Sequence, residues 1–198
     1  MTLAKHIHWG ERDSEAGAIS VAAGPSGRVH RIWLPCERGA RDEVLRRWGD
    51  DPGTVEVREG DRSRRPAALS VRKALGELTA FLDGRGVALG FPFAALEGTS
   101  FQRAVWNAVA AIPRGEVRTY GDIAAAIGQP TAVRAVGAAN GANPLPLIIP
   151  CHRVIGAGGR LTGFGGGVAL KARLLRAEGF EVSADEPGGR VRCSQATG

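Results

Sequence analysis

The stretch that decides how this chain folds is residues 143–154, which read Asn143-Pro144-Leu145-Pro146-Leu147-Ile148-Ile149-Pro150-Cys151-His152-Arg153-Val154. Its three prolines each lack a backbone donor and fix φ, so the segment cannot be helical. The apolar residues between them predict a buried, extended segment that ends at Pro150-Cys151. A glycine-rich loop with seven glycines follows between residues 156 and 167.

A run of predicted helices precedes this stretch. Apolar residues at helical spacing place them at 101–112, 120–127 and about 131–140, and Ser100 and Thr119 are the expected N-caps of the first two. Two short helices joined by a turn that contains glycine are typical of a helix-turn-helix, which docks its second helix on DNA. A purely structural helical hairpin shows the same pattern, so the pattern alone leaves both interpretations open.

The first 96 residues show the alternation that is typical of β-strands. The predicted elements are strands at 18–23 and 28–34 joined by a Gly/Pro turn, helices at 42–48 and 67–82, and a surface loop over 49–66. The pattern breaks near Leu96, which predicts a boundary between an N-terminal domain, 1–96, and a second domain, 97–180. A last helix is expected at about 168–178. The tail, 181–198, is rich in Gly, Pro, Ser and charge, and we expect it to be disordered.

Composition narrows the class of protein. The 198 residues are 43% hydrophobic, and no apolar run approaches the ~18–20 residues that a membrane span needs. Residues 1–10 hold no apolar stretch of the secretory kind and the three cysteines lie far apart, so we expect a cytoplasmic protein without a disulfide framework. The net charge is +6, and residues 97–180 carry nine Arg or Lys against four Asp or Glu. This excess favours a polyanionic partner, although an arginine-rich composition alone would also produce it.

Cys151 and His152 carry the strongest chemical signal in the sequence. A thiolate is the reactive form of cysteine, and a neighbouring base raises its fraction at neutral pH. Adjacent residues of a strand point to opposite faces, so His152 reaches Cys151 only if the chain turns or a water molecule bridges them. The alternative is a buried, inert cysteine, which is common in protein cores.

Several sequence blocks resemble, in their order, those of the O6-alkylguanine-DNA alkyltransferases, also called methylated-DNA–protein-cysteine methyltransferases. The blocks are Phe101-Gln102-Arg103-Ala104-Val105-Trp106, Ile112-Pro113-Arg114-Gly115-Glu116-Val117-Arg118-Thr119-Tyr120, Ala135-Val136-Gly137, Asn143-Pro144, Ile149-Pro150-Cys151-His152-Arg153-Val154 and Leu161-Thr162-Gly163-Phe164-Gly165-Gly166-Gly167. The resemblance covers about residues 97–180, whereas the N-terminal part resembles the family only loosely.

The resemblance implies an α+β protein of two domains. The N-terminal one would be a ribonuclease H-like α/β domain with a small antiparallel sheet, and the C-terminal one mostly helical, with a helix-turn-helix of the winged-helix type. The implied activity is single-turnover, irreversible transfer of the alkyl group from O6-alkylguanine, and from O4-alkylthymine, in duplex DNA to Cys151. Such a DNA repair protein needs no cofactor and has no membrane partner and no obligate protein partner.

The resemblance also assigns roles to five residues. Cys151 would be the nucleophile and permanent alkyl acceptor. His152 would deprotonate it through a water molecule, and Glu178 would orient that histidine. Tyr120 would protonate the departing guanine and help to rotate the damaged nucleotide. Asn143 would tie the recognition helix to the active-site segment through backbone hydrogen bonds.

DNA binding is implied for the helix that carries Arg134. O6 lies inside the stacked base pair, so the nucleotide must be flipped out before a thiolate can reach it. The small residues of this helix suit the minor groove, where the family inserts it, and Arg134 would fill the gap left by the flipped base. The full set of expected DNA-binding residues is Thr119, Tyr120, Arg134, Ala135, Gly137 and Arg153.

The substrate pocket is expected around the glycine-rich loop. Its expected residues are Pro146, Val154, Phe164, Gly165 and Gly166. Backbone N–H groups near Gly165 could bind the guanine oxygen, since glycine lets a backbone approach a ligand closely. Many relatives have a hydroxyl residue or alanine at position 165, so glycine there leads to the hypothesis that alkyl groups larger than methyl are tolerated.

Three alternatives and one metal question stay open on sequence. A lesion sensor shares the fold but lacks the acceptor cysteine, a Cys–His hydrolase would act on small molecules, and a helix-turn-helix regulator would bind one DNA sequence. Some relatives bind zinc in the N-terminal domain. Here the candidates by residue type are His6, His8, His30 and Cys36, but their spacing is not a zinc signature, and no metal is expected.

Overall fold

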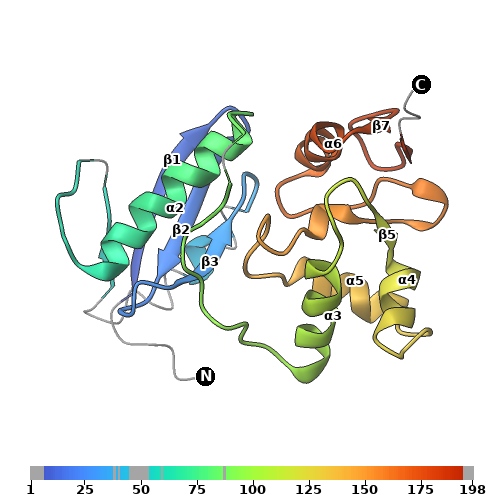
Figure 1. The fold of residues 1–198 in the computed structure, drawn as a ribbon, viewed down its shortest axis with the longest axis horizontal. Coiled ribbons are helices and arrows are strands. Elements are labelled where there is room, and N and C mark those ends of the chain that lie inside the picture. The colour runs from blue at the N-terminus through green and yellow to red at the C-terminus, as the bar shows by residue number, and fades with distance from the viewer. Residues whose placement is uncertain are drawn as a thin grey trace. The chain divides into compact units, whose positions relative to one another are not determined.

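The structure, a computed structural model, describes residues 7–37, 39, 41–44, 54–58, 60–86 and 88–193 (Figure 1). Contacts within the chain divide it after Leu96 into two compact units, 1–96 and 97–198. Together the units contain helices, a small mixed sheet and two short strand pairs, so the chain is an α+β protein.

The N-terminal unit is a four-stranded sheet with a helix across it (Figure 1). The strands are β1 (His8–Ser14), β2 (Gly17–Ala23), β3 (Val29–Trp33) and β4 (Val55–Glu56), and their spatial order is β3-β2-β1-β4. The helix α2 (Pro66–Leu82) contacts β1 and β2 with a buried stripe that includes Val71 and Leu78. Gly10 permits this close packing, because a β-carbon there would lie 2.7 Å from the carbonyl oxygen of Val57 and 3.0 Å from Cγ1 of Val71.

Three expectations for this unit need correction. The sheet is mixed rather than antiparallel, since β4 pairs with β1 in parallel. Strand β4 lies within 49–66, which was expected to be a loop, and β1 had no counterpart in the predicted elements. Glu11, Arg12 and Asp13 interrupt the apolar alternation that would predict β1, which pairs with the neighbouring β2. Strand β4 depends on pairing with β1, which lies far away in the sequence. Of the helix expected at 42–48, residues 42–44 are helical and the rest lies outside the described residues.

The C-terminal unit begins with three helices that pack together. They are α3 (Ser100–Ala110), α4 (Tyr120–Ala126) and α5 (Val133–Gly141). The N-cap of α3 is Thr99, one residue before the expected Ser100, because Thr99 forms a reciprocal capping box with Gln102. Thr119 caps α4 as predicted, in a capping box with Asp122. Trp106 joins α3 to α5, since its indole Nε1 donates a hydrogen bond of 2.7 Å to the carbonyl oxygen of Ala139.

Short elements link these helices to the segment that contains Cys151. Strand β5 (Arg118–Thr119) pairs in parallel with β6 (Val154–Ile155), so Thr119 lies opposite Ile155. The 3-10 helix η1 (Cys151–Arg153) comes immediately before β6, and the 3-10 turn η2 (Ala157–Gly159) follows it. This pairing brings the start of α4, at Tyr120, next to the chain that leaves Cys151.

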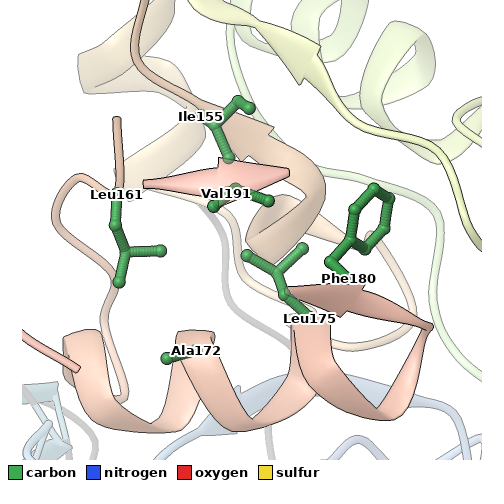
Figure 2. Packing of buried hydrophobic residues seen from close by; sticks show 6 residues of the cluster. All are labelled: Ile155, Leu161, Ala172, Leu175, Phe180 and Val191. Atoms are coloured by element: carbon green, nitrogen blue, oxygen red, sulfur yellow. The ribbon is translucent and has the colours of Figure 1, made fainter. Parts of the chain in front are cut away.

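The end of the described chain is ordered, which corrects the expectation of a disordered tail from residue 181. After α6 (Val168–Ala177), strands β7 (Phe180–Val182) and β8 (Val191–Cys193) form an antiparallel hairpin. Figure 2 shows Phe180 and Val191 packed with Ile155, Leu161, Ala172 and Leu175 in one buried cluster. A few apolar residues in a polar segment are enough once they reach a core that earlier elements have built. Residues 194–198 lie outside the described residues.

Candidate active site

The segment before Cys151 is a buried turn and not the expected extended strand. Leu147 has φ 74°, and the N–H of Ile149 donates to the carbonyl oxygen of Leu145 at 2.9 Å. Asn143 holds the turn from inside, because its Nδ2 donates to the carbonyl oxygen of Ile149 at 2.9 Å and its Oδ1 accepts from the N–H of Leu145 at 3.0 Å. The amide side chain thus supplies both a donor and an acceptor to a backbone that the prolines leave short of donors.

The chain turns again at Cys151, which is one of the two conditions under which His152 was expected to reach the cysteine. Residues 151–153 form η1, so Cys151 and His152 do not alternate across a strand. Both side chains are buried, with 6% of Cys151 and 2% of His152 exposed. Cys151 is in no disulfide.

His152 is held by a carboxylate from the end of α6. Its Nε2 lies 3.0 Å from Oε1 of Glu178. Arg153 approaches the same carboxylate, with Nε 3.0 Å from Oε2 and a terminal nitrogen 2.8 Å from Oε1. The other terminal nitrogen of Arg153 donates to the carbonyl oxygen of Ile112 at 2.7 Å. The N–H of Gly115 also donates to Glu178, at 3.3 Å. The expected DNA contact of Arg153 is therefore revised, because its guanidinium is engaged inside the protein and only 17% of the side chain is exposed.

The electrostatics of this ion-paired group favour an anionic Glu178 and a neutral His152. Burial opposes the charge of Glu178, but the hydrogen bonds from His152 and Arg153 and the positive charge of Arg153 outweigh it and lower its pKa to about 2. Burial is the main reason that the pKa of His152 is lowered, and the nearby Glu178 only partly offsets it. A neutral imidazole that donates Nε2–H to the carboxylate presents Nδ1 as an acceptor. Within the described residues Nδ1 is buried and has no hydrogen-bond partner, so it is free to accept a proton.

Lys171 of α6 is a functional candidate that the sequence-based prediction missed. Its side chain is completely buried, and Nζ donates a hydrogen bond of 2.6 Å to the carbonyl oxygen of Val154. Burial lowers the pKa of Lys171 to about 8, while attraction to Cys151 acts in the opposite direction. A signal was present in the sequence: Lys171 is spaced three residues from Val168 and four from Leu175, on the apolar face of the helix.

Tyr120 and Phe164 lie beside this group. The ring of Phe164 meets the ring of His152 edge to face, with the centroids 6.4 Å apart. The hydroxyl of Tyr120 lies 3.1 Å from Oγ1 of Thr162, in the glycine-rich loop. Of the other residues expected in the pocket, Val154, Pro146 and Gly166 are buried and Gly165 is exposed.

The expected DNA-binding residues occupy different positions on α4 and α5. Arg134 and Ala135 are exposed at the start of α5. Gly137 is half-buried and faces Tyr120, since a β-carbon built there would lie 3.9 Å from the ring. Gly137 is therefore only partly available at the surface of α5. The hydroxyl of Thr119 accepts a hydrogen bond of 3.1 Å from the N–H of Asp122 and keeps its own hydrogen for another acceptor.

The described part of the chain offers neither a metal site nor a membrane span. There, no group of three or more His, Cys, Asp or Glu side chains is arranged to hold a metal ion. His6, one of the four metal candidates by residue type, lies outside that part. Within the same residues, no helix is both long and apolar enough to cross a membrane.

The site and the fold define a class of protein: an α+β chain with a buried cysteine followed by a histidine that a carboxylate holds, the arrangement that activates cysteine nucleophiles. A family model described as "6-O-methylguanine DNA methyltransferase, DNA binding domain" matches residues 100–180. The methylated-DNA–protein-cysteine methyltransferase of Mycobacterium tuberculosis H37Rv is 58% identical over 182 residues, which are 90% of this chain and 96% of that relative. This chain belongs to the methylated-DNA–protein-cysteine methyltransferase family.

Solved structures agree with this assignment. The crystal structure of M. tuberculosis O6-methylguanine methyltransferase superposes with a TM-score of 0.66 and 36% identity, over 87% of this chain and 92% of that one. The structure of M. tuberculosis OGT in complex with DNA superposes with a TM-score of 0.65 and 36% identity, over 86% of this chain and 92% of that one. A Salmonella typhimurium methyltransferase of the same name is 61% identical over 83 residues, 42% of this chain and 48% of the relative.

Proposed function

We propose that this protein repairs alkylated DNA by moving the alkyl group from O6 of guanine to the sulfur of Cys151. The observation that carries the proposal is the buried group of Cys151, His152 and Glu178, in which a neutral imidazole held by a carboxylate directly follows the cysteine. The family supports the same chemistry, since its relatives are named for methyl transfer from DNA to a protein cysteine.

In the proposed reaction, His152 takes the thiol proton at Nδ1 through a water molecule, and Glu178 stabilises the resulting imidazolium. The ammonium of Lys171 supports the thiolate with a second positive charge. The sulfur then bonds to the alkyl carbon while the bond from that carbon to O6 breaks. Tyr120 gives its proton to the departing guanine, and the proton on His152 returns through solvent to the phenolate. The product thioether has no hydrolysis step, so each molecule acts once.

The partner in this proposal is duplex DNA that carries O6-alkylguanine. We assign α5 to the minor groove, because its exposed face combines one arginine, Arg134, with the small residues Ala135 and Ala138. Arg134 would occupy the space of the flipped nucleotide. The structure of a relative in complex with DNA supports a DNA partner.

The finer fold assignments are part of the same proposal. We assign the N-terminal unit to the ribonuclease H-like type, and the group of α3, α4, α5 and the β5–β6 pair to the winged-helix type of helix-turn-helix. The order helix, glycine-containing turn, helix in 120–141 supports the second assignment, because Gly128 ends α4 with a positive φ before α5 begins.

The test is the intact mass of the protein after mixing with a duplex that carries one O6-methylguanine, followed by peptide mapping. We expect one added methyl group on the peptide that contains Cys151 and one equivalent of restored guanine. The exposed Cys36 provides a matched control: Cys36→Ala should accept the methyl group like the wild type, and Cys151→Ala should bind the lesion without accepting it. An unmodified wild-type protein that still binds the lesion would contradict the proposal in favour of a lesion sensor. Absence of binding would favour a Cys–His hydrolase.

A further inference from the structure

Tyr120 is the first residue of α4, and its half-buried ring faces Gly137 of α5. A β-carbon built on Gly137 would lie 3.9 Å from both Cδ1 and Cε1 of Tyr120, which is ordinary van der Waals distance. The ring of Tyr120 therefore faces Gly137 of α5, with space for no more than a small side chain between them. Glycine has no side chain that could hold the ring, so the position of the hydroxyl group depends on another residue.

That residue is Thr162, which reaches Tyr120 from the glycine-rich loop. Its Oγ1 lies 3.1 Å from the phenolic oxygen of Tyr120. Its methyl group packs over Gly156, where a β-carbon would lie only 2.9 Å from Cγ2 of Thr162. The preceding residue, Leu161, is 1% exposed and anchored in the core (Figure 2). A β-branched side chain with its methyl group wedged in this way has little freedom at χ1, so its hydroxyl stays directed at Tyr120.

We propose that Thr162 is a positioning residue that donates its hydroxyl hydrogen to the phenolic oxygen of Tyr120 while Tyr120 transfers its own proton to guanine. The inference rests on the proposed function. A hydroxyl has one hydrogen to donate and two lone pairs that accept, so when Tyr120 donates its hydrogen to the base, the hydrogen bond between the two hydroxyls must run from Thr162 to the phenolic oxygen. Thr162 is placed to be that donor.

The chemistry of the transfer makes this hydrogen bond stronger as the reaction proceeds. The proton leaves Tyr120 for guanine as the bond between the alkyl carbon and O6 breaks, and negative charge develops on the phenolic oxygen. A hydrogen bond to an anion is about twice as strong as one between neutral groups. Thr162 would thus stabilise the transition state more than the complex with bound DNA, which is the requirement for an effect on rate.

Two substitutions separate the hydrogen bond from packing. Thr162→Val keeps the branched shape and removes the hydroxyl, and Thr162→Ser keeps the hydroxyl and removes the methyl group. We expect Thr162→Val to lower the limiting rate of methyl transfer about tenfold under single-turnover conditions, without a change in the DNA concentration that gives half the limiting rate. Thr162→Ser should restore most of that rate. Equal losses in both variants, or a loss confined to DNA affinity, would overturn the proposal.

A double-mutant cycle tests whether Thr162 acts through Tyr120. In a Tyr120→Phe background, Thr162→Val should cause no further loss of rate, because the phenolic oxygen is gone. Additive losses would overturn the inference. Thr79→Val is the matched control and should leave the rate unchanged, since Thr79 lies in the N-terminal unit and its buried hydroxyl has no hydrogen-bond partner among the described residues. If the wild-type protein itself accepts no methyl group, the proposed function fails; a wild type that reacts, with an additive cycle, removes only the role of Thr162.

Discussion

The C-terminal unit contains two hydrogen-bonded groups of opposite character. His152, Arg153 and Glu178 form an ion-paired group in which 2% of the histidine and 7% of the glutamate side chain are exposed. Tyr120 and Thr162 form an uncharged pair that is half-buried and joined by one hydrogen bond of 3.1 Å. The difference agrees with the proposed roles: the buried, charged group accepts the thiol proton at His152, and the more exposed, neutral pair donates a proton from Tyr120 to the guanine.

The two groups also differ in what the loss of one member does to the rest. Removing a partner from a buried ion pair leaves an uncompensated charge, at a cost of about 3–5 kcal/mol. Removing one partner of a neutral pair that solvent can reach costs about 0.5–1.5 kcal/mol. The ion-paired group therefore contributes both to the stability of the fold and to the reaction, whereas the Tyr120–Thr162 pair can be altered with the fold largely intact.

The largest expected effect comes from neutralising the carboxylate of the ion-paired group. Glu178→Gln should lower the rate of methyl transfer about 1000-fold, because the amide neither stabilises an imidazolium nor holds His152 in the tautomer with Nδ1 free. Single-turnover kinetics on O6-methylguanine DNA measure it. Glu116→Gln, which removes an exposed carboxylate paired with Arg118, is the matched control and should react at the wild-type rate. A similar rate in both variants would contradict the proposed role of Glu178.

Stability in acid should depend on the same carboxylate. The pKa of Glu178 is about 2 in the folded protein against an ordinary value of 4.5, so its contribution is complete above about pH 4.5 and is lost as the pH falls from there towards 2. A shift of this size corresponds to roughly 3 kcal/mol. The difference in melting temperature between wild type and Glu178→Gln, followed by circular dichroism, should shrink over that pH range. A constant difference would show that the ion pair does not stabilise the fold through charge.

A smaller effect is expected from the neutral pair. Tyr120→Phe should lower the limiting rate about 100-fold, as the loss of a general acid does, and leave the melting temperature nearly unchanged. Glu178→Gln should lose both rate and stability at neutral pH, whereas Tyr120→Phe should lose rate alone. If Tyr120→Phe also destabilised the protein strongly, the division between the two groups would be wrong.

The smallest expected effect concerns Lys171, which carries a buried charge outside both groups. Lys171→Met should slow methyl transfer about tenfold by removing a positive charge near Cys151. Because the pKa of Lys171 is about 8, the wild-type rate should begin to fall as the pH rises through 8 and the ammonium loses its proton. This fall should be absent from Lys171→Met and present in Lys73→Met, which changes an exposed lysine of the other unit. Identical pH profiles in all three proteins would exclude the charge effect.

Local sequence signals predicted the elements that depend on neighbours along the chain. The expected helices at 67–82, 101–112 and 168–178 correspond closely to α2, α3 and α6, because apolar spacing and end signals are encoded within a few residues. Strand β4 escaped prediction because its partner β1 is far away in the sequence. Charged residues interrupt the apolar alternation of β1, and the few apolar residues of the β7–β8 hairpin are buried against a core that earlier elements have built. The segment 143–150 was expected to be extended but is a turn, because the side-chain amide of Asn143 provides hydrogen bonds that the prolines cannot.

The sequence by itself determined which residues are chemically able to act: a cysteine followed by a histidine, one tyrosine at the start of a helix, and a glutamate at the end of another. Only the tertiary structure decided how they combine. It turned the chain at Cys151, brought Glu178 to His152, directed Arg153 inward and buried Lys171 near the thiol. The physical reason is distance along the chain: His152 and Glu178 are 26 residues apart, and Tyr120 and Thr162 are 42 apart. Contacts of that range are set by core packing and by burial, which no short motif specifies.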